Sequence, residues 1–176
     1  MSVDVAALRI VHFPDPILRR KTEPMERVDD EVRAVAERMI VLMQEAPGIG
    51  LAAPQVGLDW RLFVVHLPEG DERSAETDPM TATPEPMVFV NPVLGDFSRD
   101  LVSDEEGCLS IPGIGCEVRR PTEVTVTALD LDGSEFSLRA QGHLARCFQH
   151  EMDHLDGVLM IDRMSMRSRL KNRSAL

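Results

Sequence analysis

The sequence predicts a single domain of the α+β class, and three observations lead to that class. At 176 residues the chain is long enough to bury one hydrophobic core and too short for several. Apolar side chains recur with helical spacing over residues 29–46 and 144–156. Short β-branched, aromatic or alternating segments lie over residues 61–67, 87–91 and 124–138. Helices and strands therefore do not alternate regularly, as they would in a parallel α/β fold.

The first helix is expected over residues 29–46. Asp29 is a suitable N-cap, and Pro47 with Gly48 ends the helical pattern. Seven residues of this segment form one apolar face: Val32, Val35, Ala36, Met39, Ile40, Met43 and Ala46. The following residues, 48–55, are too rich in glycine for a helix and too apolar for a surface linker. This composition indicates backbone that lies close to another part of the molecule.

Two strands are expected next, at residues 61–67 and 87–91. The intervening residues 68–86 contain four prolines and six acids, which predicts a long, solvated loop. A loop of this length can mark a domain boundary, but the candidate functional residues lie on both sides of it. We therefore interpret residues 68–86 as an insertion within one domain.

A hairpin and a second helix complete the predicted elements. Residues 124–128 and 136–138 alternate in polarity around the turn residues Asp132 and Gly133, which is typical of a β-hairpin. Helical spacing returns over residues 144–156, and Gly157 can adopt the left-handed conformation that ends a helix.

Charge is distributed unevenly along the chain. The net charge is −11, but residues 163–176 carry five basic residues and no acid, so the rest has 14 − 30 = −16. An acidic body is a poor partner for a nucleic-acid backbone, so DNA binding is not expected and only the tail could contact a phosphate backbone. The simpler interpretation of the tail is a solvated helix end.

Composition also bears on location. The longest segment without Asp, Glu, Lys or Arg, residues 46–58, is too short for a membrane helix, and no basic start followed by an apolar stretch indicates a signal peptide. We therefore expect a cytoplasmic protein without membrane contact. Three cysteines, an odd number, favour free thiols or metal ligands over a disulfide framework.

The pattern H-E-x-x-H stands in the second predicted helix, at His150, Glu151 and His154. Two histidines four residues apart lie about 40° apart around a helix axis, so both can reach one metal ion. The alternative is a solvated acidic helix whose histidines bind nothing. A catalytic metal of this kind usually takes a third protein ligand. The 22 residues after His154 contain no His or Glu, which weakens the ordinary metalloprotease interpretation and leaves Cys108 as a candidate. The other two cysteines, Cys116 and Cys147, are expected to be small buried hydrophobes.

Three segments together resemble the peptide deformylase family. They read G-I-G-L-A-A-P-Q at residues 48–55, E-G-C-L-S at residues 106–110 and Q-H-E-M-D-H at residues 149–154. The resemblance extends over residues 10–163. It implies an α+β fold in which antiparallel strands surround a central metal-binding helix. On this basis residues 1–176 form one catalytic domain, with a loop insertion at 68–86 and a basic tail at 163–176.

The resemblance also implies the chemistry. The metal ligands would be Cys108, His150 and His154, with iron(II) as the usual physiological metal and zinc or nickel able to occupy the same site. Glu151 would accept a proton from metal-bound water and pass one to the departing amine. The oxyanion formed from the formyl group would be stabilised by the Gln55 side-chain amide and the Leu109 backbone N–H.

Substrate residues are implied in the same way. The peptide would pair as an added strand with backbone at Ile49, Gly50 and Gly107, and its methionine side chain would enter an apolar pocket lined by Ile49 and Cys147. It is equally consistent with the sequence that these two side chains belong to the hydrophobic core and do not contact the substrate. His143 and Arg146 depart from the family pattern beside this pocket. The resemblance therefore does not determine the shape of the pocket or its side-chain preference.

The function expected from these residues is removal of the N-formyl group from the initiator methionine of new polypeptides, with release of formate. One alternative is an H-E-x-x-H peptidase that cuts internal bonds. Another is a catalytically idle relative that binds ribosomes or nascent chains through its basic tail. Intact Glu151, Gln55 and Cys108 speak against the idle relative. The resemblance also implies a ribosome contact, because family members can dock there through a basic C-terminal helix, and the short tail at residues 163–176 has the charge for it.

Overall fold

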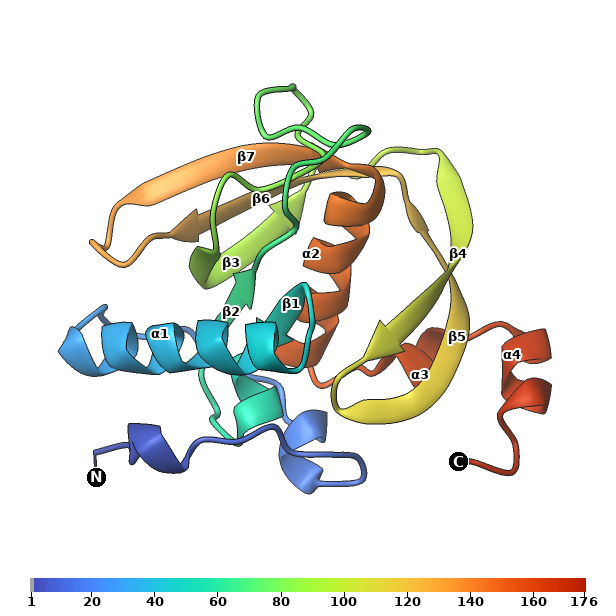
Figure 1. Cartoon of the computed structure of the whole chain (residues 1–176), viewed down its shortest axis with the longest axis horizontal. Helices are drawn as coiled ribbons and strands as arrows, with labels where there is room; N and C mark the ends of the chain where they lie inside the picture. Colours follow the sequence, from blue (N-terminus) through green and yellow to red (C-terminus); the bar gives the residue numbers. More distant parts are fainter. Residues whose placement is uncertain (1) are drawn as a thin grey trace.

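The computed structural model describes residues 2–176 and contains one five-stranded antiparallel sheet, one two-stranded ribbon and four α-helices in that range (Figure 1). The order of strands in the sheet is β1-β2-β3-β6-β7. Their bounds are Gly50–Ala52 for β1, Leu62–Val65 for β2, Met87–Gly95 for β3, Glu123–Leu129 for β6 and Glu135–Gln141 for β7. The mixture of helices with antiparallel strands confirms the predicted α+β class.

Two helices cover opposite faces of this sheet, and the alternation along β2 shows why. Leu62 and Val64 pack into a cluster with helix α1 (Asp30–Glu45), whereas Phe63 and Val65 pack into a second cluster with helix α2 (Gly142–Leu155). All four side chains are buried, because β2 is covered on both sides. The sheet is thus the middle layer between α1 and α2.

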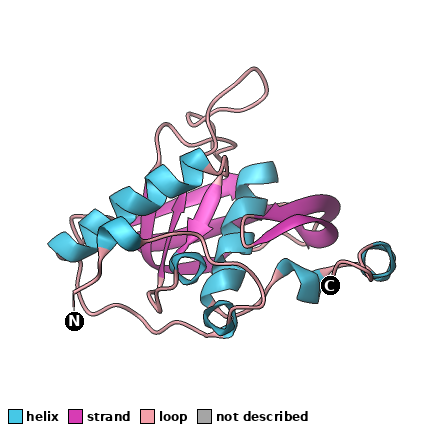
Figure 2. Ribbon diagram, turned by 60° about the horizontal axis from the view of Figure 1, so that its bottom comes forward, coloured by secondary structure: helices cyan, strands magenta, loops and turns pink. Residues whose placement is uncertain are grey.

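The two-stranded ribbon lies on the other side of α2. It consists of β4 (Leu101–Cys108) and β5 (Ile111–Pro121), and Figure 2 shows α2 between this ribbon and the sheet. A third apolar cluster joins β5 to the short helix α3 (Met160–Arg163). Helix α2 is therefore enclosed, and every side chain from Leu144 to Leu155 is buried.

The remaining elements are short. Three 3-10 turns lie at Val5–Ala7, Pro16–Arg19 and Ala53–Val56. Helix α4 (Met166–Lys171) lies in the basic tail. No helix within residues 2–176 combines the length and apolar character that a membrane span requires.

Most elements predicted from the sequence are confirmed. Asp29 caps α1, since its Oδ1 accepts from the Val32 N–H at 3.1 Å, and Gly157 has the left-handed φ of 72°. The predicted hairpin corresponds to β6 and β7. Several details differ: α2 begins two residues before the predicted start, β2 is shorter and β3 longer than predicted, and neither strand β1 nor the ribbon β4–β5 was predicted.

Residues 68–86 are irregular, as expected, but they are less solvated than their composition suggests. Ala82 and Thr83 are buried, and Thr83 Oγ1 accepts from the Leu67 N–H at 3.0 Å. Met80 forms an isolated bridge with Ala140 of β7. The acidic residues are exposed, whereas the second half of the segment is held by the contacts of Met80 and Thr83.

Candidate metal centre

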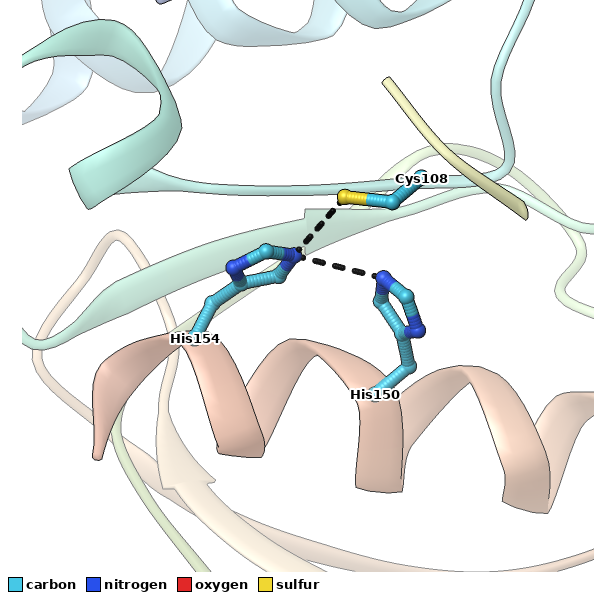
Figure 3. Close-up of side chains that lie close together, drawn as sticks. All are labelled: Cys108, His150 and His154. Carbon is cyan, nitrogen blue, oxygen red and sulfur yellow. Dashed lines mark hydrogen bonds between the residues drawn. The ribbon is translucent and has the colours of Figure 1, made fainter. Parts of the chain in front are cut away.

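Helix α2 brings two imidazoles together. His150 and His154 are four residues apart and therefore lie on the same face of the helix. Their Nε2 atoms are 3.2 Å apart. Figure 3 shows both rings on the same side of the helix. The two residues are 9% and 1% exposed, so both imidazoles are largely removed from water. The alternative of solvated surface histidines is contradicted by this burial.

Cys108 reaches the same point from the end of β4. Its Sγ lies 3.3 Å from His154 Nε2 (Figure 3), and the three ligand atoms all lie within 4.8 Å of one another. The pairing of β4 with β5 shifts register between Glu106 and Cys108, at Gly107. Such irregularities re-aim side chains beside functional sites.

The donor set fits a transition-metal ion. One sulfur and two imidazole nitrogens converge, and this mixture of ligands suits borderline divalent metals. Glu106 Oε2 lies 2.9 Å from His150 Nδ1, an interaction that leaves Nε2 of His150 directed at the other two donors. A carboxylate on the second ring nitrogen is the usual partner of a metal-binding histidine.

The polar groups around these donors are tightly placed. Gln55 Oε1 accepts from the Ala52 N–H at 2.8 Å, and its Nε2 lies 3.6 Å from Cys108 Sγ and 3.3 Å from Ser110 Oγ. Gly50 contacts Glu151: a Cβ at Gly50 would collide with the Glu151 carboxylate. Glycine is therefore required at position 50 for Glu151 to occupy its place.

A cavity of about 440 Å³ opens at this point. With the exception of His154, the site residues expected from the sequence line it: Ile49, Gly50, Gln55, Gly107, Cys108, Leu109, Cys147, His150 and Glu151. His143 and Arg146 are part of the same wall. The structure therefore brings together residues from three segments that are distant in the sequence.

A family model, related sequences and solved structures all match this chain to the same family. The family model described as polypeptide deformylase matches residues 7–170. The chain belongs to the peptide deformylase family. A peptide deformylase of Gloeobacter violaceus is 47% identical over 89% of this chain and 79% of its own length. One from Teredinibacter turnerae is 44% identical over 98% of this chain and 95% of its own length. The crystal structure of the Ehrlichia chaffeensis peptide deformylase superimposes with a TM-score of 0.84, at 36% identity, over 96% of this chain and 98% of that one.

Peptide deformylases are metal-dependent hydrolases that remove the N-formyl group from nascent polypeptides. The expected enzyme class is thereby confirmed, and the idle relative is not favoured. The peptide deformylase fold expected from the three motifs is confirmed as well.

Burial changes the acid–base properties of this deformylase site. Burial raises the pKa of Glu151 to about 7, and Glu151 Oε2 is buried with no hydrogen-bond partner among the described residues. Burial also opposes ionisation of Glu106, but hydrogen bonds from Arg120 and His150 outweigh it and hold the pKa of Glu106 well below its usual range. The two carboxylates of the site thus differ in proton affinity because Glu106 accepts hydrogen bonds from arginine side chains, whereas the buried Glu151 carboxylate accepts none from the described residues.

The deformylase motifs did not reveal the network behind the candidate metal ligands. Arg120 donates to both oxygens of Glu106 and, through Nη1, to Asp153 Oδ2 at 2.9 Å. Arg146 also donates to Glu106, at 2.8 Å. Glu106 and Asp153 lie inside the quoted motifs, so the sequence offered a reason to examine them. Arg120 lies outside all three motifs, and nothing in the sequence pointed to it.

Proposed function

We propose that Cys108, His150 and His154 bind one divalent metal ion and that the enzyme uses this site to remove the formyl group from N-formylmethionyl peptides, with release of formate. The observation that carries the proposal is the convergence of the three donors beside Glu151 in one cavity. We further propose that residues 1–176 act as one catalytic domain, with 68–86 as an insertion and 163–176 as a tail.

Glu151 is the proposed general base and acid. A bound divalent metal ion supplies Lewis acidity at this site, since it polarises a carbonyl and lowers the pKa of water to about 7. The raised pKa of Glu151 suits a group that first accepts a proton from the attacking water and then donates one to the departing amine. Its unpartnered Oε2 is available for that proton.

Gln55 and Leu109 are the proposed oxyanion donors. The Gln55 carbonyl is occupied by the Ala52 N–H, which directs the amide Nε2 towards Cys108. A donor held in this way before reaction stabilises developing negative charge without reorganisation. Leu109 follows Cys108 directly along the chain and lines the same cavity.

The peptide part of the substrate is proposed to pair with backbone at Ile49, Gly50 and Gly107. A Cβ at Gly107 would meet no atom within 4 Å, so this backbone borders open space that another chain can enter. Cys147 Sγ lies 3.7 Å from the Ile49 carbonyl, and both residues line the cavity. We propose that they contact the methionine side chain.

Iron(II) is the proposed physiological metal, with zinc(II) or nickel(II) able to bind the same ligands. Thiolate and imidazole donors accept all three ions, so supply in the cell selects the metal. Oxidation of iron during purification is avoided by anaerobic handling.

The test is an assay of formate release from a formyl-Met tripeptide with anaerobically purified enzyme, accompanied by metal analysis. Wild-type enzyme should contain about one metal ion per chain and release formate. The Glu151→Ala variant should retain its metal and lose its rate, whereas Glu135→Ala, at an exposed site, should behave as wild type. Cleavage of internal bonds in acetylated peptides, without formate release, would support the peptidase alternative instead.

The tail is a proposed docking surface for the ribosome. Helix α4 contacts β5 through polar groups, since Ser168 Oγ accepts from the Glu117 N–H and Asn172 Nδ2 donates to the Gly115 carbonyl. Its outer side exposes Met166 and Leu170, at 75% and 67%, flanked by Arg167, Arg169, Lys171 and Arg173. An apolar and basic surface of this kind suits an anionic partner. The remaining cation of the tail, Arg163, is engaged by Asp153.

A cytoplasmic location is proposed from the substrate and the cysteines. Nascent polypeptides are available in the compartment where translation takes place. Cys108, Cys116 and Cys147 are all free thiols in the structure, which suits a reducing compartment. Fractionation of cells followed by immunodetection tests this location directly.

A further inference from the structure

Arg146 is a buried arginine in the wall of the active-site cavity. It lies on α2 one turn before His150, and only 5% of its surface is exposed. Its guanidinium group does not point at free solvent. Nη1 donates to Glu106 Oε1 at 2.8 Å and to the Val118 carbonyl at 2.9 Å, and Nη2 donates to the Val102 carbonyl at 2.8 Å.

These three acceptors belong to the ribbon that carries Cys108. Val102 and Glu106 lie on β4, and Val118 lies on β5. Arg146 itself lies on the helix that carries the two histidines. A single side chain thus connects the element that supplies the sulfur donor to the element that supplies both nitrogen donors.

Resting on the proposed metal site, we infer that Arg146 is a positioning residue that sets the distance between Cys108 and the histidine pair and fixes Glu106 against His150. Glu106 makes four short polar contacts: two with Arg120, one with Arg146 and one with His150 Nδ1. Each carboxylate oxygen is therefore held twice, and the orientation of the His150 ring follows from this arrangement.

Arg120 also connects the ribbon to α2, but through side-chain acceptors alone. Its guanidinium contacts Glu106 and Asp153, and it stands on β5, so it ties the ribbon to the later part of α2. Arg146 adds the ties to the main chain of both ribbon strands. It also balances charge, because the buried carboxylates Glu106 and Asp153 then face two buried guanidinium groups, those of Arg120 and Arg146.

The position of Arg146 in the cavity wall suggests a competing role, direct recognition of the substrate side chain. The geometry argues against it, since three hydrogen bonds commit the guanidinium to acceptors within the protein. The methylene stem is the part left to line the cavity. Arg146 therefore contributes apolar wall to the pocket and polar contacts to the metal ligands.

The test uses cobalt(II) as a spectroscopic probe of the full-length enzyme. Cobalt affinity is measured by competition with a chromophoric chelator, and the thiolate-to-cobalt absorption band reports the ligand geometry. Arg146→Met keeps the length of the side chain and removes all donors. Arg146→Lys keeps the charge but cannot reach three acceptors together. The control, Arg139→Met, removes an exposed arginine that pairs with Glu123.

Arg146→Met should bind cobalt about 10 to 100-fold more weakly than wild type, with a weakened or shifted thiolate band. Arg146→Lys should fall between the two, and Arg139→Met should match wild type. Affinity within about threefold of wild type and an unchanged band in Arg146→Met would overturn the inference, even if its melting temperature fell. A changed preference for the substrate side chain at unchanged cobalt affinity would overturn it in favour of direct recognition.

A misfolded variant and a wild-type enzyme without a thiolate-to-cobalt band have distinct consequences. If Arg146→Met does not fold, Arg146→Lys decides, and wild-type affinity with a wild-type band in that variant overturns the inference. If wild-type enzyme itself shows no thiolate-to-cobalt band, the proposed metal site fails and the inference falls with it. The ratio of variant to wild type thus tests Arg146, whereas the wild-type spectrum tests the site.

Discussion

Replacing Glu151 by glutamine should stabilise the metal-stripped protein at alkaline pH. The Glu151 carboxyl is 4% exposed, and burial raises its pKa from 4.5 to about 7. The folded state therefore retains this proton over a pH range in which the unfolded chain has released it. Wild-type stability consequently falls as the pH rises from about 4.5 to 7, and the neutral glutamine avoids that loss.

The magnitude follows from the two pKa values. One pKa unit corresponds to about 1.4 kcal/mol, so the raised pKa of Glu151 lowers the free energy of unfolding by about 1.4 kcal/mol at pH 5.5 and by about 3 kcal/mol at pH 8. The stability advantage of Glu151→Gln over wild type should accordingly increase by about 2 kcal/mol between these pH values.

Urea unfolding in the presence of a chelator, at pH 5.5 and pH 8, measures this difference. Glu135→Gln is the matched control, because the same substitution at an exposed position should give no pH-dependent change. An advantage for Glu151→Gln that is equal at both pH values would refute the reasoning, because it would mean that burial does not raise the pKa of Glu151.

Three further predictions concern activity and binding. Gln55→Ala should lower kcat about a hundredfold or more in the formate assay while metal content stays at the wild-type level, because one oxyanion donor is lost and no ligand is removed; loss of metal would contradict the assignment. Dialysis against a chelator should abolish formate release and lower the melting temperature, and added iron(II) or nickel(II) should restore both under anaerobic conditions. Truncation after Met164 should weaken salt-sensitive co-sedimentation with ribosomes and leave hydrolysis of a formyl-Met tripeptide unchanged; unchanged co-sedimentation would show that the tail does not dock.

The residues of the candidate metal site could be singled out from the sequence because they lie in three compact motifs. His150 and His154 share a helical face by spacing alone, and helix α2 places them as expected. The position of Cys108 relative to them depends on a ribbon that the sequence did not indicate. Strand β4 is mostly exposed and acidic and shows no alternation. In β5 the alternation of Ile114, Cys116 and Val118 is short and follows a segment with glycine and proline, which are depleted in strands.

The supporting network could not be predicted, for a different reason. Arg120, Arg146 and Asp153 are charged, and charged residues are usually exposed; the sequence placed Arg146 beside the pocket but indicated no partner for any of the three. They are buried because each finds an oppositely charged partner across an element boundary. Such pairing depends on the tertiary arrangement of α2 against the ribbon and leaves no local pattern.

The lengths of several elements were also set by tertiary contacts. Strand β3 continues beyond residue 91 because β6 pairs with its second half after a register shift. The loop at residues 68–86 is held by a hydrogen bond from the Leu67 N–H to Thr83 Oγ1. Its acidic, proline-rich composition did not indicate this contact.

The most direct test of the metal centre is X-ray absorption spectroscopy of anaerobically purified enzyme at the metal edge. The structure predicts one sulfur and two imidazole nitrogens in the first coordination shell; for a zinc-loaded sample these lie at about 2.3 Å and about 2.0 to 2.1 Å. Cys108→Ser should remove the sulfur contribution. A first shell without sulfur in the wild-type enzyme would contradict the assignment of Cys108, and with it the account of how the ribbon and helix α2 form the site.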